Sequence, residues 1–93
     1  DVFIIKPMVS GGFTDCKKII NLARTENIRT VITSSLETAI GRTACLHLAA
    51  ANEVSEVCGL ATGSLLIEDK PSNPIQDGKI AIPDSHGLGV DLL

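Results

Sequence analysis

Three places in the sequence put residues with chemical potential at the end of a short apolar run. Lys6 ends the first run, Ser34 ends the second, and Gly59 and Thr62 belong to the third. A lysine directly after four apolar residues is costly to place without a use, although such a side chain can also extend into solvent. The amides of a helix start at Ser34 would favour a carboxylate or a phosphate group. These residue types together indicate a site for an anionic small molecule.

The serines also have a local, structural interpretation. Ser34 and Glu37 match the S-x-x-E capping box, in which two side chains bind the free amides at the start of a helix. Glu37 is therefore expected to cap the helix rather than to act as a catalytic acid. A capped helix still presents amides and a partial positive charge to a ligand, so capping and binding are compatible at Ser34.

Strand and helix patterns alternate along the chain and would bring these residues to one edge of a sheet. The run 2–5 is continuously apolar, which is typical of a strand buried on both faces. The order βαβαβ predicts an α/β fold with parallel strands, whose functional groups lie at their C-terminal ends. The predicted elements are a strand over 2–5, a helix of about three turns from Thr14, a strand over 29–33, a helix from Ser34 to near Asn52, a strand in 57–63, a loop over 68–74 and a short strand over 80–83.

Composition excludes several classes of function. The 93 residues carry eight Lys and Arg against eleven Asp and Glu, a net charge of −3, and only two aromatic residues, Phe3 and Phe13. Such a chain is a poor match for phosphate tracking or base stacking, so no nucleic acid partner is expected. The three cysteines lack zinc-site or disulfide spacing and are expected to be reduced. No uncharged apolar run reaches the ~18 residues of a membrane span, so we expect no membrane association and a cytoplasmic location.

Four motifs in this order resemble those of the enolase superfamily, within it the muconate-lactonizing-enzyme subgroup, and most closely the o-succinylbenzoate synthases. The motifs are Phe3-Ile4-Ile5-Lys6-Pro7 with Ser10-Gly11-Gly12, residues 31–41, Cys58-Gly59-Leu60-Ala61-Thr62-Gly63, and Ile80-Ala81-Ile82-Pro83 with Gly87-Leu88-Gly89-Val90. The fold of that superfamily is a (β/α)7β TIM-like barrel with a separate capping domain. The resemblance implies that residues 1–67 are strands six to eight, the C-terminal third of the barrel. Residues 68–93 would then be a C-terminal extension packing toward the capping domain.

The resemblance also implies roles for individual residues. Lys6 matches the sixth-strand lysine and would be catalytic, stabilising an enediolate as a cation. Ser34 and Leu36 match seventh-strand positions that line the substrate pocket. Gly59 and Thr62 match the end of the eighth strand, which receives the succinyl part of the substrate. The Mg²⁺ cofactor of the family is expected to take its ligands upstream of this chain, so no metal ligand is assigned within it.

The implied reaction is the Mg²⁺-assisted dehydration of 2-succinyl-6-hydroxy-2,4-cyclohexadiene-1-carboxylate to 2-succinylbenzoate, a step toward menaquinone. The chain alone is expected to be inactive, with a small-molecule carboxylate, the remaining barrel strands and the capping domain as partners. N-succinylamino acid racemase, dipeptide epimerase and muconate cycloisomerase activities on the same scaffold stay open. A small non-catalytic α/β interaction module is the alternative from another class, since the βαβαβ order alone does not require an active site.

Overall fold

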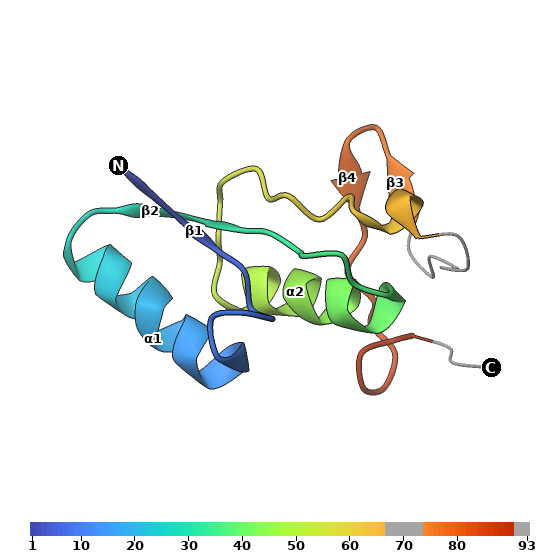
Figure 1. The fold of residues 1–93 in the computed structure, drawn as a ribbon, viewed down its shortest axis with the longest axis horizontal. Helices are drawn as coiled ribbons and strands as arrows, with labels where there is room; N and C mark the ends of the chain where they lie inside the picture. The colour runs from blue at the N-terminus through green and yellow to red at the C-terminus, as the bar shows by residue number, and fades with distance from the viewer. Residues whose placement is uncertain (67–73, 91–93) are drawn as a thin grey trace.

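The computed structural model describes residues 1–66 and 74–90. Two strands alternate with two helices, and a short 3-10 helix and a small hairpin follow (Figure 1). The mixed α/β character that the alternation predicts is therefore confirmed. The elements are β1 Val2–Ile5, α1 Gly12–Thr25, β2 Arg29–Ile32, α2 Ala39–Ala51, the 3-10 helix η1 Gly63–Leu65, β3 Ile75–Gln76 and β4 Lys79–Ile80.

β1 and β2 form a parallel pair connected through α1. Their register places Val2 beside Arg29 and Ile5 beside Ile32. Parallel neighbours need a crossover rather than a tight turn, and α1 supplies it. Both helices lie on the same side of the strand pair in Figure 1. The predicted strand–helix–strand unit is thus confirmed for the first part of the chain.

The prediction of a third strand over 57–63 is wrong. The segment makes a single isolated parallel bridge between Thr33 and Gly59. Two hydrogen bonds of 2.9 Å form this bridge, from the Ser34 amide to the Gly59 carbonyl and from the Gly59 amide to the Ile32 carbonyl. The chain turns into η1 at Gly63, only four residues later, so the pairing cannot extend into a ladder.

The two helices begin at other residues than the sequence predicts. α1 starts at Gly12, two residues before Thr14, because Gly11 takes a left-handed conformation with φ 93°. α2 starts at Ala39 instead of Ser34, and Thr38 is its extended N-cap without a side-chain hydrogen bond. The capping box is therefore not formed.

Small and aliphatic side chains, without an aromatic residue, make up the core between the strands and the helices. Its buried residues are Ile5, Cys16, Ile20, Ile32, Cys45, Leu48, Ala49 and Leu60. Such side chains allow helices to pack closely on strands, which explains how the chain forms a core with two phenylalanines, both exposed.

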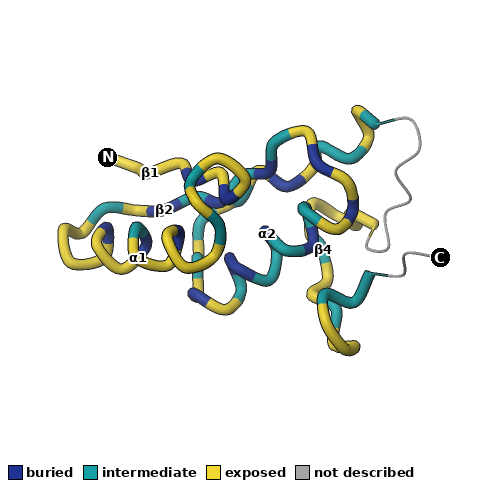
Figure 2. The backbone as a smooth tube through the Cα atoms, turned by 60° about the horizontal axis from the view of Figure 1, so that its bottom comes forward, coloured by how far each residue is buried: buried dark blue, intermediate teal, exposed yellow. Residues whose placement is uncertain are grey.

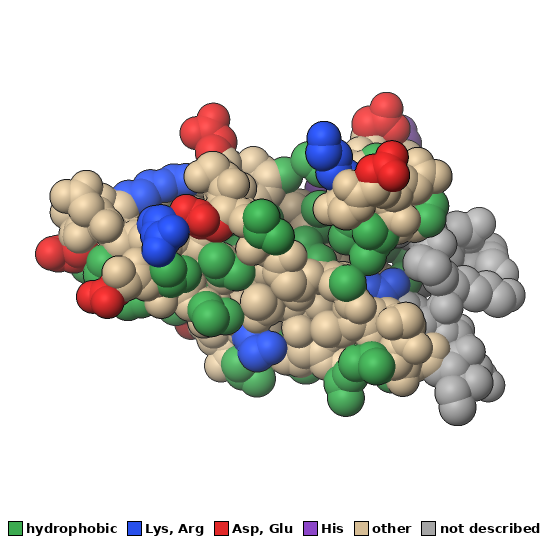
Figure 3. Space-filling view, turned by 90° about the horizontal axis from the view of Figure 1, so that it is seen from above, with side chains coloured by type: hydrophobic (Ala, Val, Ile, Leu, Met, Phe, Trp, Pro, Cys, Tyr) green, Lys and Arg blue, Asp and Glu red, His purple; other side chains and the backbone are tan. Residues whose placement is uncertain are grey.

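The prediction that β1 is buried on both faces is wrong for the described chain. Ile5 is buried, but Val2, Phe3 and Ile4 are exposed, with Ile4 at 68% (Figure 2). The reason is that β1 pairs only with β2 among residues 1–66 and 74–90, and the core covers one face. Figure 3 shows the resulting surface, with hydrophobic side chains open to solvent between separate charged groups.

The C-terminal part of the described chain is a hairpin followed by an irregular segment. β3 and β4 are antiparallel, and Asp77 and Gly78 connect them with φ of 52° and 71°, as two-residue hairpin turns require. The short strand predicted over 80–83 reaches only Ile80. Except for Pro74, the loop predicted over 68–74 lies outside the described residues. In the two described stretches we find no helix with the length and apolar character needed to span a bilayer.

Candidate functional site

The C-terminal ends of β1, β2 and the segment around Gly59 lie side by side. The Thr33 amide donates to the Ile5 carbonyl at 2.9 Å, and the Ser34 amide donates to the Gly59 carbonyl at the same distance. β2 is therefore the middle of three parallel chain segments, and Lys6, Ser34 and Gly59 follow one another across their ends. We call this row of residues the strand-end edge.

Lys6 stands at the strand-end edge with a fixed backbone and a free side chain. Its carbonyl accepts the amides of Val9 at 3.0 Å and Ser10 at 2.9 Å, which closes the turn after β1. The side chain is exposed, and its ammonium makes no hydrogen bond or ion pair within residues 1–66 and 74–90. An ammonium held in this way is available to an anionic group of a ligand.

Ser34 and Thr62 are joined through their hydroxyl groups. The Thr62 hydroxyl donates to the Ser35 carbonyl at 2.9 Å, and the Oγ atoms of Ser34 and Thr62 are 2.9 Å apart. Since the Thr62 proton is used on Ser35, Ser34 is the donor to Thr62. The Gly59 carbonyl lies 3.4 Å from the Ser34 hydroxyl. Ser34 is only 2% exposed, so in this structure its hydroxyl fixes the edge rather than facing solvent.

Gly59 packs against the Thr33 side chain, and Leu36 lies open to solvent. A Cβ on Gly59 would lie 2.9 Å from the Cγ2 methyl of Thr33, so the close approach of the two segments requires glycine. Leu36 is 65% exposed directly after the Ser34–Ser35 pair. An exposed leucine provides apolar surface for the hydrocarbon body of a carboxylate ligand.

Glu37 is a buried carboxylate that sequence reasoning assigned to a helix cap. It is 5% exposed, and its Oε1 accepts the Ser35 amide at 2.7 Å. Its Oε2 lies 3.9 Å from the Sγ of Cys45, which donates to it. Burial, with smaller contributions from Glu37 and Cys16, raises the pKa of Cys45 to about 12. Gly41 has no side chain, and this leaves the space in which Glu37 Oε2 lies. A glycine four residues after Glu37 is therefore the feature of the sequence that relates to the burial of this carboxylate.

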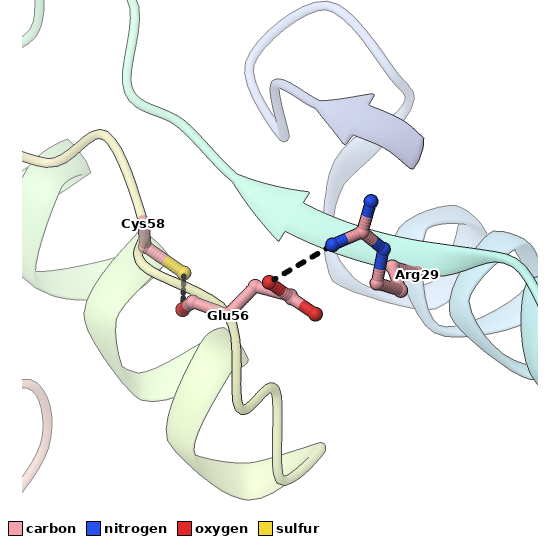
Figure 4. Close-up of polar contacts among 3 residues, drawn as sticks. All are labelled: Arg29, Glu56 and Cys58. Carbon is pink, nitrogen blue, oxygen red and sulfur yellow. Dashed lines mark hydrogen bonds and ion pairs between the residues drawn. The ribbon is translucent and has the colours of Figure 1, made fainter. Parts of the chain in front are cut away.

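The N-terminal end of β2 carries different groups. Arg29 and Glu56 form an ion pair of 3.9 Å there, and the Cys58 thiol donates to the Glu56 carbonyl at 3.4 Å (Figure 4). Both side chains of the pair are partly open to solvent, so the pair contributes little to stability.

A hollow of about 310 Å³ lies between the two helices. Phe13, Lys17 and His47 are among the residues that line it, and none of the predicted site residues does.

The described residues do not form a metal site. Among residues 1–66 and 74–90 no group of three or more His, Cys, Asp or Glu side chains is placed to hold a metal ion. The buried carboxylate of Glu37 uses its oxygens on the Ser35 amide and the Cys45 thiol. The described residues therefore do not fit the Mg²⁺ that the resemblance to the enolase superfamily implies.

Known proteins are similar to this chain over most of its length. O-succinylbenzoate synthase from Mycobacterium marinum is 36% identical over 95% of the chain and 28% of its own length. O-succinylbenzoate synthase from Desulfotalea psychrophila is 39% identical over 81% of the chain and 20% of its own length. Muconate cycloisomerase 1 from Rhodococcus opacus is 30% identical over 99% of the chain and 26% of its own length.

The chain spans about a quarter of the length of these relatives. No solved structure matches it at the same level of significance. The family model described as enolase C-terminal domain-like matches residues 1–93. Such domains have a TIM-barrel-like α/β fold, with which the parallel strands and covering helices agree, and the chain belongs to the enolase C-terminal domain-like family.

Proposed function

We propose that this chain is the C-terminal part of an o-succinylbenzoate synthase-like lyase, with residues 1–67 as strands six to eight of a (β/α)7β barrel. The exposed apolar side chains of β1 and its second edge, which pairs with no strand of the described residues, support a place inside a larger barrel. Residues 68–93 would form the C-terminal extension toward a capping domain. The ligands of the expected Mg²⁺ would come from outside this chain.

The observation that carries the proposal is the exposed ammonium of Lys6 at the strand-end edge, which has no hydrogen-bond or ion-pair partner among residues 1–66 and 74–90. Dehydration of 2-succinyl-6-hydroxy-2,4-cyclohexadiene-1-carboxylate removes the proton next to the carboxylate and expels the 6-hydroxyl group, so that water leaves and the ring becomes aromatic. Negative charge develops on the carboxylate as that proton departs. A positioned ammonium stabilises such charge, and one donor of this kind contributes roughly 10²- to 10³-fold to the rate.

Substrate binding would use the remaining residues of the edge. Leu36 offers exposed apolar surface. Gly59, whose lack of a side chain lets its segment pack against Thr33, would present its exposed backbone to the substrate. Ser34 and Thr62 would shape the region that receives the succinyl chain, with Ser34 acting from its buried position through Thr62.

Assaying the full-length protein with the hydroxycyclohexadiene substrate and Mg²⁺ tests this function, with formation of the aromatic product as the readout. We expect turnover by the wild type and a loss of at least about 100-fold in kcat for Lys6→Ala. Lys18→Ala is the matched control, because Lys18 is an exposed lysine on α1 whose ion pair within the described residues is with Asp15 at 3.8 Å. Full turnover by Lys6→Ala would remove Lys6 from the mechanism.

Muconate cycloisomerase activity is the second candidate, favoured by the similarity to the Rhodococcus opacus protein over nearly the entire chain. Incubation with cis,cis-muconate distinguishes muconate cycloisomerase activity from the synthase activity. Consumption of muconate without turnover of the hydroxycyclohexadiene would replace the first proposal by the second. Exchange of the α-proton of N-succinyl amino acids or dipeptides for deuterium would indicate a racemase or epimerase instead.

A further inference from the structure

The peptide of Ser35 is held by two side chains instead of a neighbouring strand. Its amide donates to Glu37 Oε1 at 2.7 Å, and its carbonyl accepts the Thr62 hydroxyl at 2.9 Å. The bridge between β2 and the Gly59 segment ends at Ser34, one residue earlier. The conformation of the chain between β2 and α2 therefore depends on Glu37 and Thr62.

The burial of Glu37 suits a carboxylate that holds the Ser35 amide and not one that reacts with a substrate. At 5% exposure it is out of reach of a substrate at the strand-end edge. Its second oxygen faces the Cys45 thiol, and a Cβ at position 41 would collide with that oxygen. A buried carboxylate is costly unless its oxygens are hydrogen-bonded, and the Ser35 amide is its short partner.

Two residues of the proposed substrate site depend directly on this peptide. Leu36 follows Ser35 and is 65% exposed, and Thr62 is bound to the Ser35 carbonyl. We propose that Glu37 is a positioning residue that sets Leu36 and Thr62 for substrate by holding the Ser35 amide. This inference rests on the proposed function and deepens it, because it adds a residue that shapes the site without touching the substrate.

Steady-state kinetics of the full-length enzyme on the hydroxycyclohexadiene substrate test the positioning role with three variants. Glu37→Met removes the acceptor, and Glu37→Asp keeps the charge but shortens the side chain, so both should raise KM about 10-fold or more with kcat within about 3-fold. Glu37→Gln keeps an oxygen at Oε1 and should restore KM to within about 3-fold of the wild type. If Glu37→Met does not fold, the contrast between the Asp and Gln variants carries the same information.

Glu56 supplies the matched control, since its carboxylate lies at the opposite end of β2 (Figure 4). Glu56→Met and Glu56→Gln should leave KM and kcat unchanged. A Glu37→Gln enzyme that folds but loses kcat would overturn the positioning role, because it would make the carboxyl proton part of the reaction. An unchanged KM in both Glu37→Met and Glu37→Asp would overturn it as well.

Hydrogen exchange of the Ser35 amide tests the same contact without any turnover. In the full-length protein the exchange should become at least about 10-fold faster in Glu37→Asp and Glu37→Met, and stay slow in Glu37→Gln and Glu56→Gln. This pattern in a protein that does not convert the substrate would reject the proposed function and retain the role of Glu37 in positioning. Active enzyme with unchanged exchange in the Asp variant would reject the positioning alone.

Discussion

The hydroxyl groups of Ser34 and Thr62 lie 2.9 Å apart and join the end of β2 to the residue before η1. Because Thr62 also donates to the Ser35 carbonyl, one threonine satisfies two polar groups of the neighbouring segment. The contact spans 28 residues of sequence and closes the strand-end edge where only one bridge pairs the backbones. Side-chain hydrogen bonds from Ser34 and Thr62 therefore hold together two chain segments that a ladder of backbone hydrogen bonds would hold in a regular sheet.

Thr62→Val should destabilise the full-length protein by about 1–3 kcal/mol. The substitution removes the donor to the Ser35 carbonyl and leaves the buried Ser34 hydroxyl with only the longer contact to the Gly59 carbonyl at 3.4 Å. Unmade hydrogen bonds of buried groups cost about this much. Thr62→Ser keeps the hydroxyl and should cost less than about 1 kcal/mol. Urea unfolding of both variants measures the difference, and equal stabilities would show that the hydroxyl cluster contributes nothing.

Gly59→Ala should destabilise the protein by about 1–3 kcal/mol, since the new Cβ would press on the Thr33 methyl group at 2.9 Å. Thr33→Ser removes that methyl group and keeps the hydroxyl. The double variant should therefore recover most of the stability that Gly59→Ala loses relative to Thr33→Ser. A double-mutant cycle from urea unfolding measures this coupling, and strictly additive effects would contradict the close approach of the two segments.

Local patterns predict the first part of the fold well. The β-branched and apolar runs of β1 and β2 and the amphipathic spacing of α1 are properties of consecutive residues, so the sequence reveals them. The end of α2 near Asn52 is likewise recovered. Burial of β1 is not local, because it depends on which segments pair with it, and Ile4 is exposed as a result.

The features that the sequence does not predict depend on partners that lie far apart in the sequence or that only the packed core defines. Ser34 matches a capping motif, but a tertiary partner, Thr62, binds its hydroxyl, and α2 begins five residues later. Glu37 binds the Ser35 amide from within the core, where packing against Cys45 places it. The strand-end position of Lys6 follows from the βαβ pattern, whereas its catalytic role stays a prediction drawn from family resemblance.

Stability should fall at alkaline pH through Cys45. Its pKa is raised from 9.0 to about 12, mainly by burial, so the folded protein keeps a proton that the unfolded chain releases above pH 9. The contribution is complete below pH 9 and is lost as the pH rises toward 12. Between pH 8 and pH 10.5 the wild type should lose roughly 1–2 kcal/mol more than Cys45→Ala in urea unfolding. Parallel losses in the two proteins would contradict the raised pKa.

Thiol labelling gives an independent measure of the same environment. Cys16 and Cys45 are buried, whereas Cys58 is partly open, so a soluble disulfide reagent should modify Cys58 first in the native protein. Labelling of Cys45 should require unfolding even at pH 9.5. Mass spectrometry of the labelled peptides distinguishes the three thiols, and early modification of Cys45 would show that its position is accessible.

His47 should anchor the described C-terminal segment to α2. Its Nε2 lies 3.0 Å from the Leu88 carbonyl, and since a carbonyl only accepts, Nε2 carries the proton in this contact. His47→Ala should leave the local turn from the Gly89 amide to the His86 carbonyl intact, because that bond lies within the segment. The segment would then keep its turn and lose the hydrogen bond to α2. In His47→Ala its amides should therefore exchange faster, and proteases should cleave it sooner, than in the wild type. His86→Ala is the control, because the His86 side chain is exposed and has no hydrogen bond or ion pair within the described residues. Equal protection in the two variants would assign the anchoring to other contacts.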